Sequence, residues 1–128
     1  MHQSIFMSFR VAFEGIFYAF SQNRNLKTHF LAAFIVILAS IFFQVNVFEM
    51  GVLGLVILLV IASEMINTAL EEMVDLITTE HHRRAKAAKD VAAGMVLVTA
   101  IGAVIIGFLI FTPHIVVFLG RLGIKLGE

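Results

Sequence analysis

The sequence predicts an all-α integral membrane protein, made of an amphipathic surface helix followed by three transmembrane helices. Hydrophobic residues make up 60% of the chain and charged residues 14%, and the mean hydropathy is +1.00. Soluble domains average about 45–50% apolar and about 25% charged residues. Three long stretches are apolar enough to cross a bilayer core about 30 Å thick. The composition therefore argues against a soluble enzyme and favours a single membrane-embedded domain over residues 1–128.

Charge and cysteine content exclude several other classes of protein. The nine basic and nine acidic residues balance, whereas proteins that bind nucleic acid normally carry a basic excess. The chain has no cysteine, which rules out disulfide frameworks, thiolate metal sites and thiol nucleophiles.

Residues 1–22 have the pattern of a helix that lies at the membrane surface. Phenylalanines recur at spacings of three or four, which places them on one helical face. A second face carries only small residues, namely Ser8, Ala12, Gly15 and Ala19. We expect this face to allow the close approach of another helix or of a flat ligand.

The three apolar stretches predict membrane spans over 30–48, 47–63 and 91–111, with Pro113 interrupting the last. Residues 76–90, which carry four of the nine basic residues, are expected to form a loop. Basic residues also precede the first span, while Arg121 and Lys125 alone follow the third. By the positive-inside rule, the amino terminus and the 76–90 loop are expected to face the cytoplasm.

An acidic stripe follows the second span. Glu64, Asn67, Glu71 and Asp75 are separated by three, four and four residues. At 100° per residue they lie within about 60° of one another, along about 16 Å of one helical face. Charges at the edge of a span are costly and often mark function.

Carboxylate and amide oxygens are suitable ligands for Mg²⁺ that also binds phosphate. A carboxylate at the interface is also placed to take a proton from a hydroxyl whose lipid tail stays in the bilayer. Beyond the stripe, Lys89 is a suitable contact for polyphosphate, and Asp90 is placed to cap the third span.

Less specific interpretations of these residues stay open. A polar helix face at a membrane edge is often simply solvated, and Glu72 points about 80° away from the stripe. The pair His81–His82 has no second pair at metal-ligand spacing, so we interpret these as loop histidines. The sequence contains no Walker motif, GxGxxG or HExxH.

These residues together resemble a known family, the small prokaryotic diacylglycerol kinases and undecaprenol kinases. Residues 64–75, EMINTALEEMVD, resemble the family signature E-x-x-N-[TS]-A-[IL]-E-x-x-V-D. Residues 80–94, EHHRRAKAAKDVAAG, resemble a second family segment, as do the spacings of Ser8, Ala12 and Gly15 and of Arg24, Asn25 and His29. The resemblance covers residues 5 to 112.

The resemblance implies an ATP- and Mg²⁺-dependent lipid kinase of the bacterial cytoplasmic membrane. It implies a homotrimer with active sites formed between neighbouring subunits, and no nucleic-acid partner. Glu64 would act as the general base and Glu71 would hold Mg²⁺. The nucleotide would contact Asn67, Glu80, His82, Lys89 and Asp90, with Asp75, Ser8 and Ala12 in supporting positions.

The sequence departs from the family pattern at Asn23. The family usually has a glutamate there that helps Glu71 to hold metal, whereas an amide brings an oxygen but no charge. We therefore expect Asn23 to be a weaker metal and nucleotide contact.

The run Lys86–Gly94 looks more like the undecaprenol kinase branch, so we expect undecaprenol as the substrate, with diacylglycerol as the alternative. Two other classes compete with a kinase: a small proton-coupled transporter subunit and a membrane scaffold without catalysis. A transporter would place its acidic residue near the middle of the bilayer, whereas Glu64 is expected at the interface.

Overall fold

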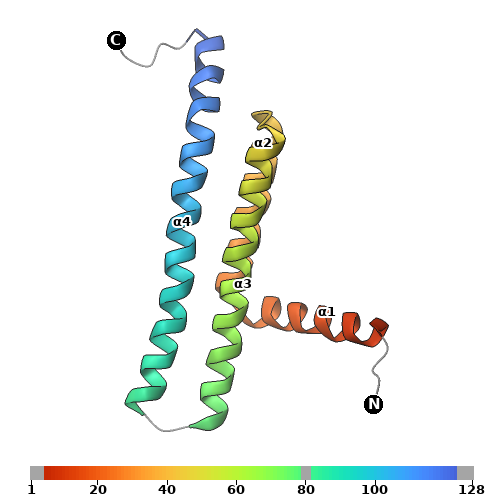
Figure 1. The fold of residues 1–128 in the computed structure, drawn as a ribbon, viewed down its shortest axis with the longest axis vertical. Coiled ribbons are helices and arrows are strands. Elements are labelled where there is room, and N and C mark those ends of the chain that lie inside the picture. Colours follow the sequence, from red (N-terminus) through yellow and green to blue (C-terminus); the bar gives the residue numbers. More distant parts are fainter. Residues whose placement is uncertain (1–4, 79–81, 124–128) are drawn as a thin grey trace.

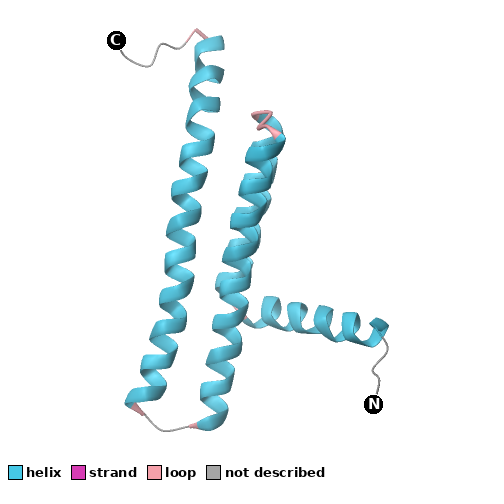
Figure 2. Ribbon diagram, viewed as in Figure 1, coloured by secondary structure: helices cyan, strands magenta, loops and turns pink. Residues whose placement is uncertain are grey.

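The computed structural model describes residues 5–78 and 82–123. These residues form four helices and no strand: α1 (Ile5–Gln22), α2 (Arg24–Phe42), α3 (Val47–Ile77) and α4 (Arg83–Arg121). In Figure 1, α2, α3 and α4 run lengthwise while α1 runs across them, and Figure 2 shows how little of the described chain is loop. The predicted all-α class, with three long helices and one separate amino-terminal helix, is confirmed.

Helices α2, α3 and α4 are each long and apolar enough to cross a membrane. At 1.5 Å per residue, the 31 residues of α3 extend about 46 Å and the 39 residues of α4 about 58 Å. Both lengths exceed a bilayer core of about 30 Å. The acidic end of α3 and the basic start of α4 therefore extend beyond the apolar layer.

The turn between α2 and α3 differs from the expected boundary, because α2 ends at Phe42 instead of continuing through the predicted span 30–48. Gln44 adopts a positive φ of 54°, which ends the helical path. Asn46 then caps α3: its side chain accepts a hydrogen bond from the Glu49 backbone N–H at 2.9 Å. The Glu49 carboxylate in turn accepts one from the Asn46 backbone N–H, completing a capping box.

The connection between α3 and α4 is much shorter than the expected loop 76–90. Helix α3 continues to Ile77, and α4 begins at Arg83 with His82 as its N-cap. The expected loop was inferred from polarity alone, but arginine, alanine and lysine are all good helix formers. Asp90 consequently lies inside α4 and does not cap it.

Helix α4 also continues through Pro113, where the predicted span stopped. Proline removes one backbone donor, yet the helix extends to Arg121. The hydroxyl of Thr112, the residue before Pro113, donates to the Phe108 carbonyl at 2.6 Å. At the same end of the bundle, His114 contacts Glu49 of α3 at 2.9 Å.

The helices pack through small side chains. The buried positions include Ala19, Ala33, Ser40, Ser63 and Ala92. Between α3 and α4, the hydroxyls of Ser63 and Thr99 lie 2.9 Å apart. Large apolar residues such as Leu58 and Phe108 point outward, as expected for helices whose outer faces contact lipid and whose backbones approach closely.

Leu26, at the start of α2, is a large apolar side chain that is fully buried. Replacing Leu26 with alanine should leave a cavity and destabilise the fold by about 2–5 kcal/mol. The matched control is Leu31→Ala in the same helix, where the leucine is 60% exposed. Thermal unfolding in detergent micelles should show a clear loss of Tm for the first variant only; equal losses would contradict this packing.

Candidate functional site

A single residue, Asn23, separates α1 from α2. Its backbone N–H donates to the Ala19 carbonyl at 2.9 Å and closes the last turn of α1. Its side-chain oxygen accepts from the backbone N–H groups of Asn25 at 2.8 Å and Leu26 at 3.2 Å, and so caps α2. Because Asn23 itself is extended, with φ −102° and ψ 114°, the chain changes direction here.

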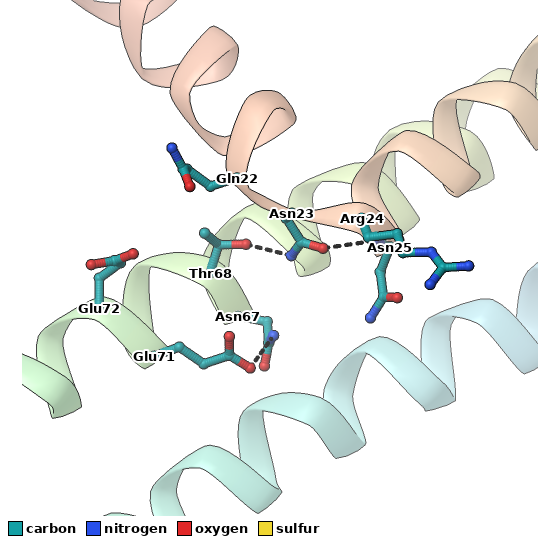
Figure 3. Close-up of a pocket in the computed structure, with 8 residues that line it drawn as sticks. All are labelled: Gln22, Asn23, Arg24, Asn25, Asn67, Thr68, Glu71 and Glu72. Carbon is teal, nitrogen blue, oxygen red and sulfur yellow. Dashed lines mark hydrogen bonds between the residues drawn. The ribbon is translucent and has the colours of Figure 1, made fainter.

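The same side chain also reaches α3. Its Nδ2 donates to Glu64 Oε1 at 2.9 Å and to Thr68 Oγ1 at 2.7 Å. The contact with Thr68 is visible in Figure 3. Glu64 is only 1% exposed, and Thr68, one turn further on, donates to the Glu64 backbone carbonyl at 3.0 Å. The carboxylate predicted to be the general base is therefore buried and in contact with the corner between α1 and α2.

A polar cavity of about 270 Å³ opens next to this corner, and Figure 3 shows its lining. Inside it, Asn67 Nδ2 donates to Glu71 Oε1 at 2.9 Å. The Asn67 carbonyl oxygen is buried, and within the described residues it has no hydrogen-bond partner. Buried polar atoms rarely lack a partner, so this oxygen is suited to contact a bound polar ligand.

An apolar groove of about 660 Å³ runs along the other side of the corner, between α1 and α3. It shares Thr68 and Glu72 with the polar cavity. The rest of its lining is mostly small or apolar: Ala12, Gly15, Ile16, Tyr18, Ala19, Met65 and Ala69. A polar compartment and an apolar one therefore meet at Thr68 and Glu72, beside Glu64.

Glu72 lines both the polar cavity and the apolar groove, and it also contacts α1. The Tyr18 hydroxyl donates to Glu72 Oε1 at 3.3 Å. The negative charge of Glu72 and this hydrogen bond raise the pKa of Tyr18 above its usual value. Tyr18 therefore stays protonated at neutral pH and keeps this contact between α1 and α3.

The oxygens of Glu71 and Asn67 fit a magnesium ion. Mg²⁺ typically takes one or two protein carboxylates and fills its remaining positions with phosphate oxygens and water. Within the described residues no group of three histidine or acidic side chains is assembled for a metal, so an ion held by Glu71 and the unpartnered Asn67 oxygen would need phosphate or water for its other positions. For Asn23, the expected role as a metal ligand would require its oxygen to leave the α2 cap.

The predicted nucleotide contacts on α4 lie apart from the polar cavity of the same chain. Lys89 pairs with Asp75 of α3 at 2.6 Å, and Asp90 pairs with Lys86 one turn away. His82 caps α4, its Nδ1 accepting from the Arg84 backbone N–H at 3.3 Å.

Glu80 lies outside the described residues. The structure thus brings Asn23, Glu64, Asn67 and Glu71 together but not the α4 residues. Of the two supporting positions on α1, Ala12 lines the apolar groove, whereas Ser8 is exposed and lies outside its lining.

Two residues of the site were missed by the sequence analysis. Thr68 follows Glu64 by four residues, so the helical period places it on the same face. Tyr18 is the only tyrosine in the chain and lies on the α1 face toward α3. The helical spacing from Glu64 was therefore enough to predict the position of Thr68. No sequence pattern predicts the contact between Tyr18 and Glu72, because 54 residues separate them.

Comparisons with known proteins identify the family of this chain. The sequence profile of the family described as prokaryotic diacylglycerol kinase matches residues 10–111. A "Diacylglycerol kinase" of Synechocystis sp. (strain ATCC 27184 / PCC 6803 / Kazusa) is 41% identical over 111 residues, covering 86% of this chain and 63% of that protein. An "Undecaprenol kinase" of Bacillus subtilis (strain 168) is 42% identical over 110 residues, covering 86% of this chain and 89% of that protein.

The present chain thus spans less than two thirds of the Synechocystis protein and most of the Bacillus protein. The match to the family profile, over residues 10–111, includes both the acidic stripe of α3 and the first part of α4. The chain therefore belongs to the prokaryotic diacylglycerol kinase family, a family of lipid kinases.

Proposed function

We propose that this protein transfers the γ-phosphoryl group of ATP to the hydroxyl of a membrane lipid, in a Mg²⁺-dependent reaction at the cytoplasmic edge of the membrane. Undecaprenol is the favoured acceptor. The observation that carries the proposal is the meeting of a polar cavity and an apolar groove at Thr68 and Glu72, beside the buried Glu64. A kinase for lipids needs such a junction, because one substrate is highly charged and the other is held in the bilayer.

Glu64 is the proposed general base. From Val47 to Glu64 the helix rises about 26 Å, so the carboxylate lies near the cytoplasmic edge of a core about 30 Å thick. The lipid hydroxyl would approach along the apolar groove and reach Glu64 past Thr68, which lies one turn away. Because Glu64 is 1% exposed, the side chains around it must shift to admit the hydroxyl. A positioned base that accepts the hydroxyl proton typically contributes about 10²–10⁴-fold.

The nucleotide and metal are assigned to the polar cavity. Glu71 would hold Mg²⁺, and the buried oxygen of Asn67 would contact the metal or the nucleotide. The metal would neutralise charge on the phosphates, which is the main requirement of phosphoryl transfer. The protein's own part is to fix both carboxylates on α3, seven residues apart on the same helical face.

His82, Lys89 and Asp90 are proposed to contact the nucleotide from a neighbouring subunit of a homotrimer. Among the described residues α4 packs along its length against α3 and meets Phe42 and Phe43 only near its far end, and the apolar part of α4 is not buried within the chain. An open face of this kind is compatible with a second copy, whose α4 would then complete the polar cavity. The basic start of α4 also supports placing this side in the cytoplasm.

The two relatives are about equally similar to this chain and carry the names of kinases for different lipids. The run Lys86–Gly94 favours undecaprenol, and diacylglycerol is the alternative acceptor, with phosphatidic acid as its product. Both lipids present a primary hydroxyl on a long apolar tail, so the reaction would be the same.

Glu64→Gln should lower the rate of lipid phosphorylation by at least about 10²-fold, because the amide accepts no proton. ATP binding, measured by calorimetry in detergent, should change little. The control is Glu14→Gln, which removes an exposed α1 carboxylate that pairs with Arg10 at the surface. Substantial turnover by Glu64→Gln would remove Glu64 from the role of base.

Glu71→Gln should raise the Mg²⁺ concentration needed for half-maximal activity by about tenfold or more, because the only cavity carboxylate proposed for the metal is lost. Asn23→Glu, which introduces the acid that the family pattern carries, should lower that concentration. Titrations of MgCl₂ at fixed ATP would measure both shifts. An unchanged Mg²⁺ dependence in both variants would contradict the assignment of metal to this cavity.

In mixed micelles that contain undecaprenol and diacylglycerol at equal mole fraction, undecaprenol should be phosphorylated with a kcat/KM about tenfold higher, the usual scale for discrimination by an apolar pocket. Radiolabelled ATP and separation of the two lipid products give the ratio directly. A ratio below one would assign the protein to diacylglycerol.

A further inference from the structure

We infer that Asn23 is a positioning residue for Glu64, and that its amide holds the carboxylate in place while the same side chain fixes the corner between α1 and α2. The inference rests on the proposed role of Glu64 as the base. It assigns Asn23 a role different from the neutral metal ligand that the sequence comparison with the family suggested.

The hydrogen-bonding capacity of Asn23 supports this role. An asparagine side chain has two N–H donors and two oxygen lone pairs. The two donors are used by Glu64 Oε1 at 2.9 Å and Thr68 Oγ1 at 2.7 Å. The two lone pairs are used by the backbone N–H groups of Asn25 at 2.8 Å and Leu26 at 3.2 Å. No lone pair is left for a metal ion in this arrangement.

The orientation of the amide follows from its neighbours. Backbone N–H groups only donate, so the side-chain atom that faces Asn25 and Leu26 must be the oxygen. The nitrogen must then face α3, where the Glu64 carboxylate accepts its hydrogen. The helix cap therefore determines which atom of Asn23 meets the base.

The surroundings of Glu64 make this contact important. The carboxylate is 1% exposed, and within the described part of the chain Asn23 is the side chain that hydrogen-bonds it. A buried carboxylate without such a donor would be strongly disfavoured. The donor also fixes the direction of one carboxylate oxygen, and small misplacements of a catalytic group can lower rates by up to about 10²-fold.

The chain supplies a matched pair of positions for testing this role. Asn46 caps α3 with the same residue type, but at the opposite end of that helix from the site. Serine is as good an N-cap as asparagine, yet its short hydroxyl cannot reach across to α3. Asn23→Ser therefore keeps the cap and removes the donor to Glu64, whereas Asn46→Ser tests the same exchange away from the site.

The kinetic experiment compares Asn23→Ser, Asn23→Ala and Asn46→Ser in lipid phosphorylation. Asn23→Ser and Asn23→Ala should both lose about tenfold or more in kcat. The Mg²⁺ half-saturation and the KM values for ATP and lipid should stay within about twofold of wild type. Only Asn23→Ala should also lose thermal stability, because serine retains the cap. Asn46→Ser should behave as wild type in every measurement.

Three kinetic outcomes would overturn the inference. Wild-type kcat in Asn23→Ser together with a loss in Asn23→Ala would make the cap the only role of Asn23. A raised Mg²⁺ requirement in Asn23→Ser at unchanged kcat would make it a metal ligand. A raised lipid KM alone would assign its effect to the placement of α1.

A second measurement does not depend on activity. The infrared difference between wild type and Glu64→Gln isolates the carboxylate stretch of Glu64. This band should shift when the same difference is taken in the Asn23→Ser background and should stay in place in the Asn46→Ser background. A band that does not move would overturn the inference even in an active enzyme. A shifted band in a protein that phosphorylates no lipid would instead contradict the proposed function and leave the contact established.

Discussion

The site depends on one corner of the chain, where Asn23 ends α1, caps α2 and hydrogen-bonds α3. A helix start leaves several backbone N–H groups without partners, and a polar side chain at the N-cap must satisfy them. Here the side-chain oxygen of Asn23 satisfies the α2 N–H groups, while its amide nitrogen donates a hydrogen bond to Glu64. The direction in which α1 leaves the bundle and the placement of the buried carboxylate are therefore determined by the same residue.

This corner also separates two environments that a lipid kinase must bring together. On one side, Asn67 and Glu71 line a polar cavity, and on the other, α1 and α3 enclose an apolar groove. Small residues on both helices make the groove possible, because they allow the backbones to approach without filling the space between them. Tyr18 and Glu72 link α1 to α3 across its polar margin.

Much of the fold was predictable from the sequence, because membrane spans depend on length and hydropathy alone. The residues at which the helices begin and end were not predictable in the same way, and each wrong boundary has a local cause. The predicted span 30–48 included Gln44 and Asn46, but a positive φ at Gln44 and the helix cap formed by Asn46 place both residues in the turn. Residues 83–90 were read as a loop because they are charged, although their propensity is helical.

The sequence by itself determined the class of the protein, the acidic stripe of α3 and the membership of a lipid kinase family, since these depend on composition, helical period and a local motif. Only the tertiary structure decided what Asn23 does and which residues face Glu64. Asn23 lies 41 residues from Glu64 and 45 from Thr68, and no periodicity relates positions on different helices. The contact forms because the α2 cap orients the amide and α3 packs against that corner.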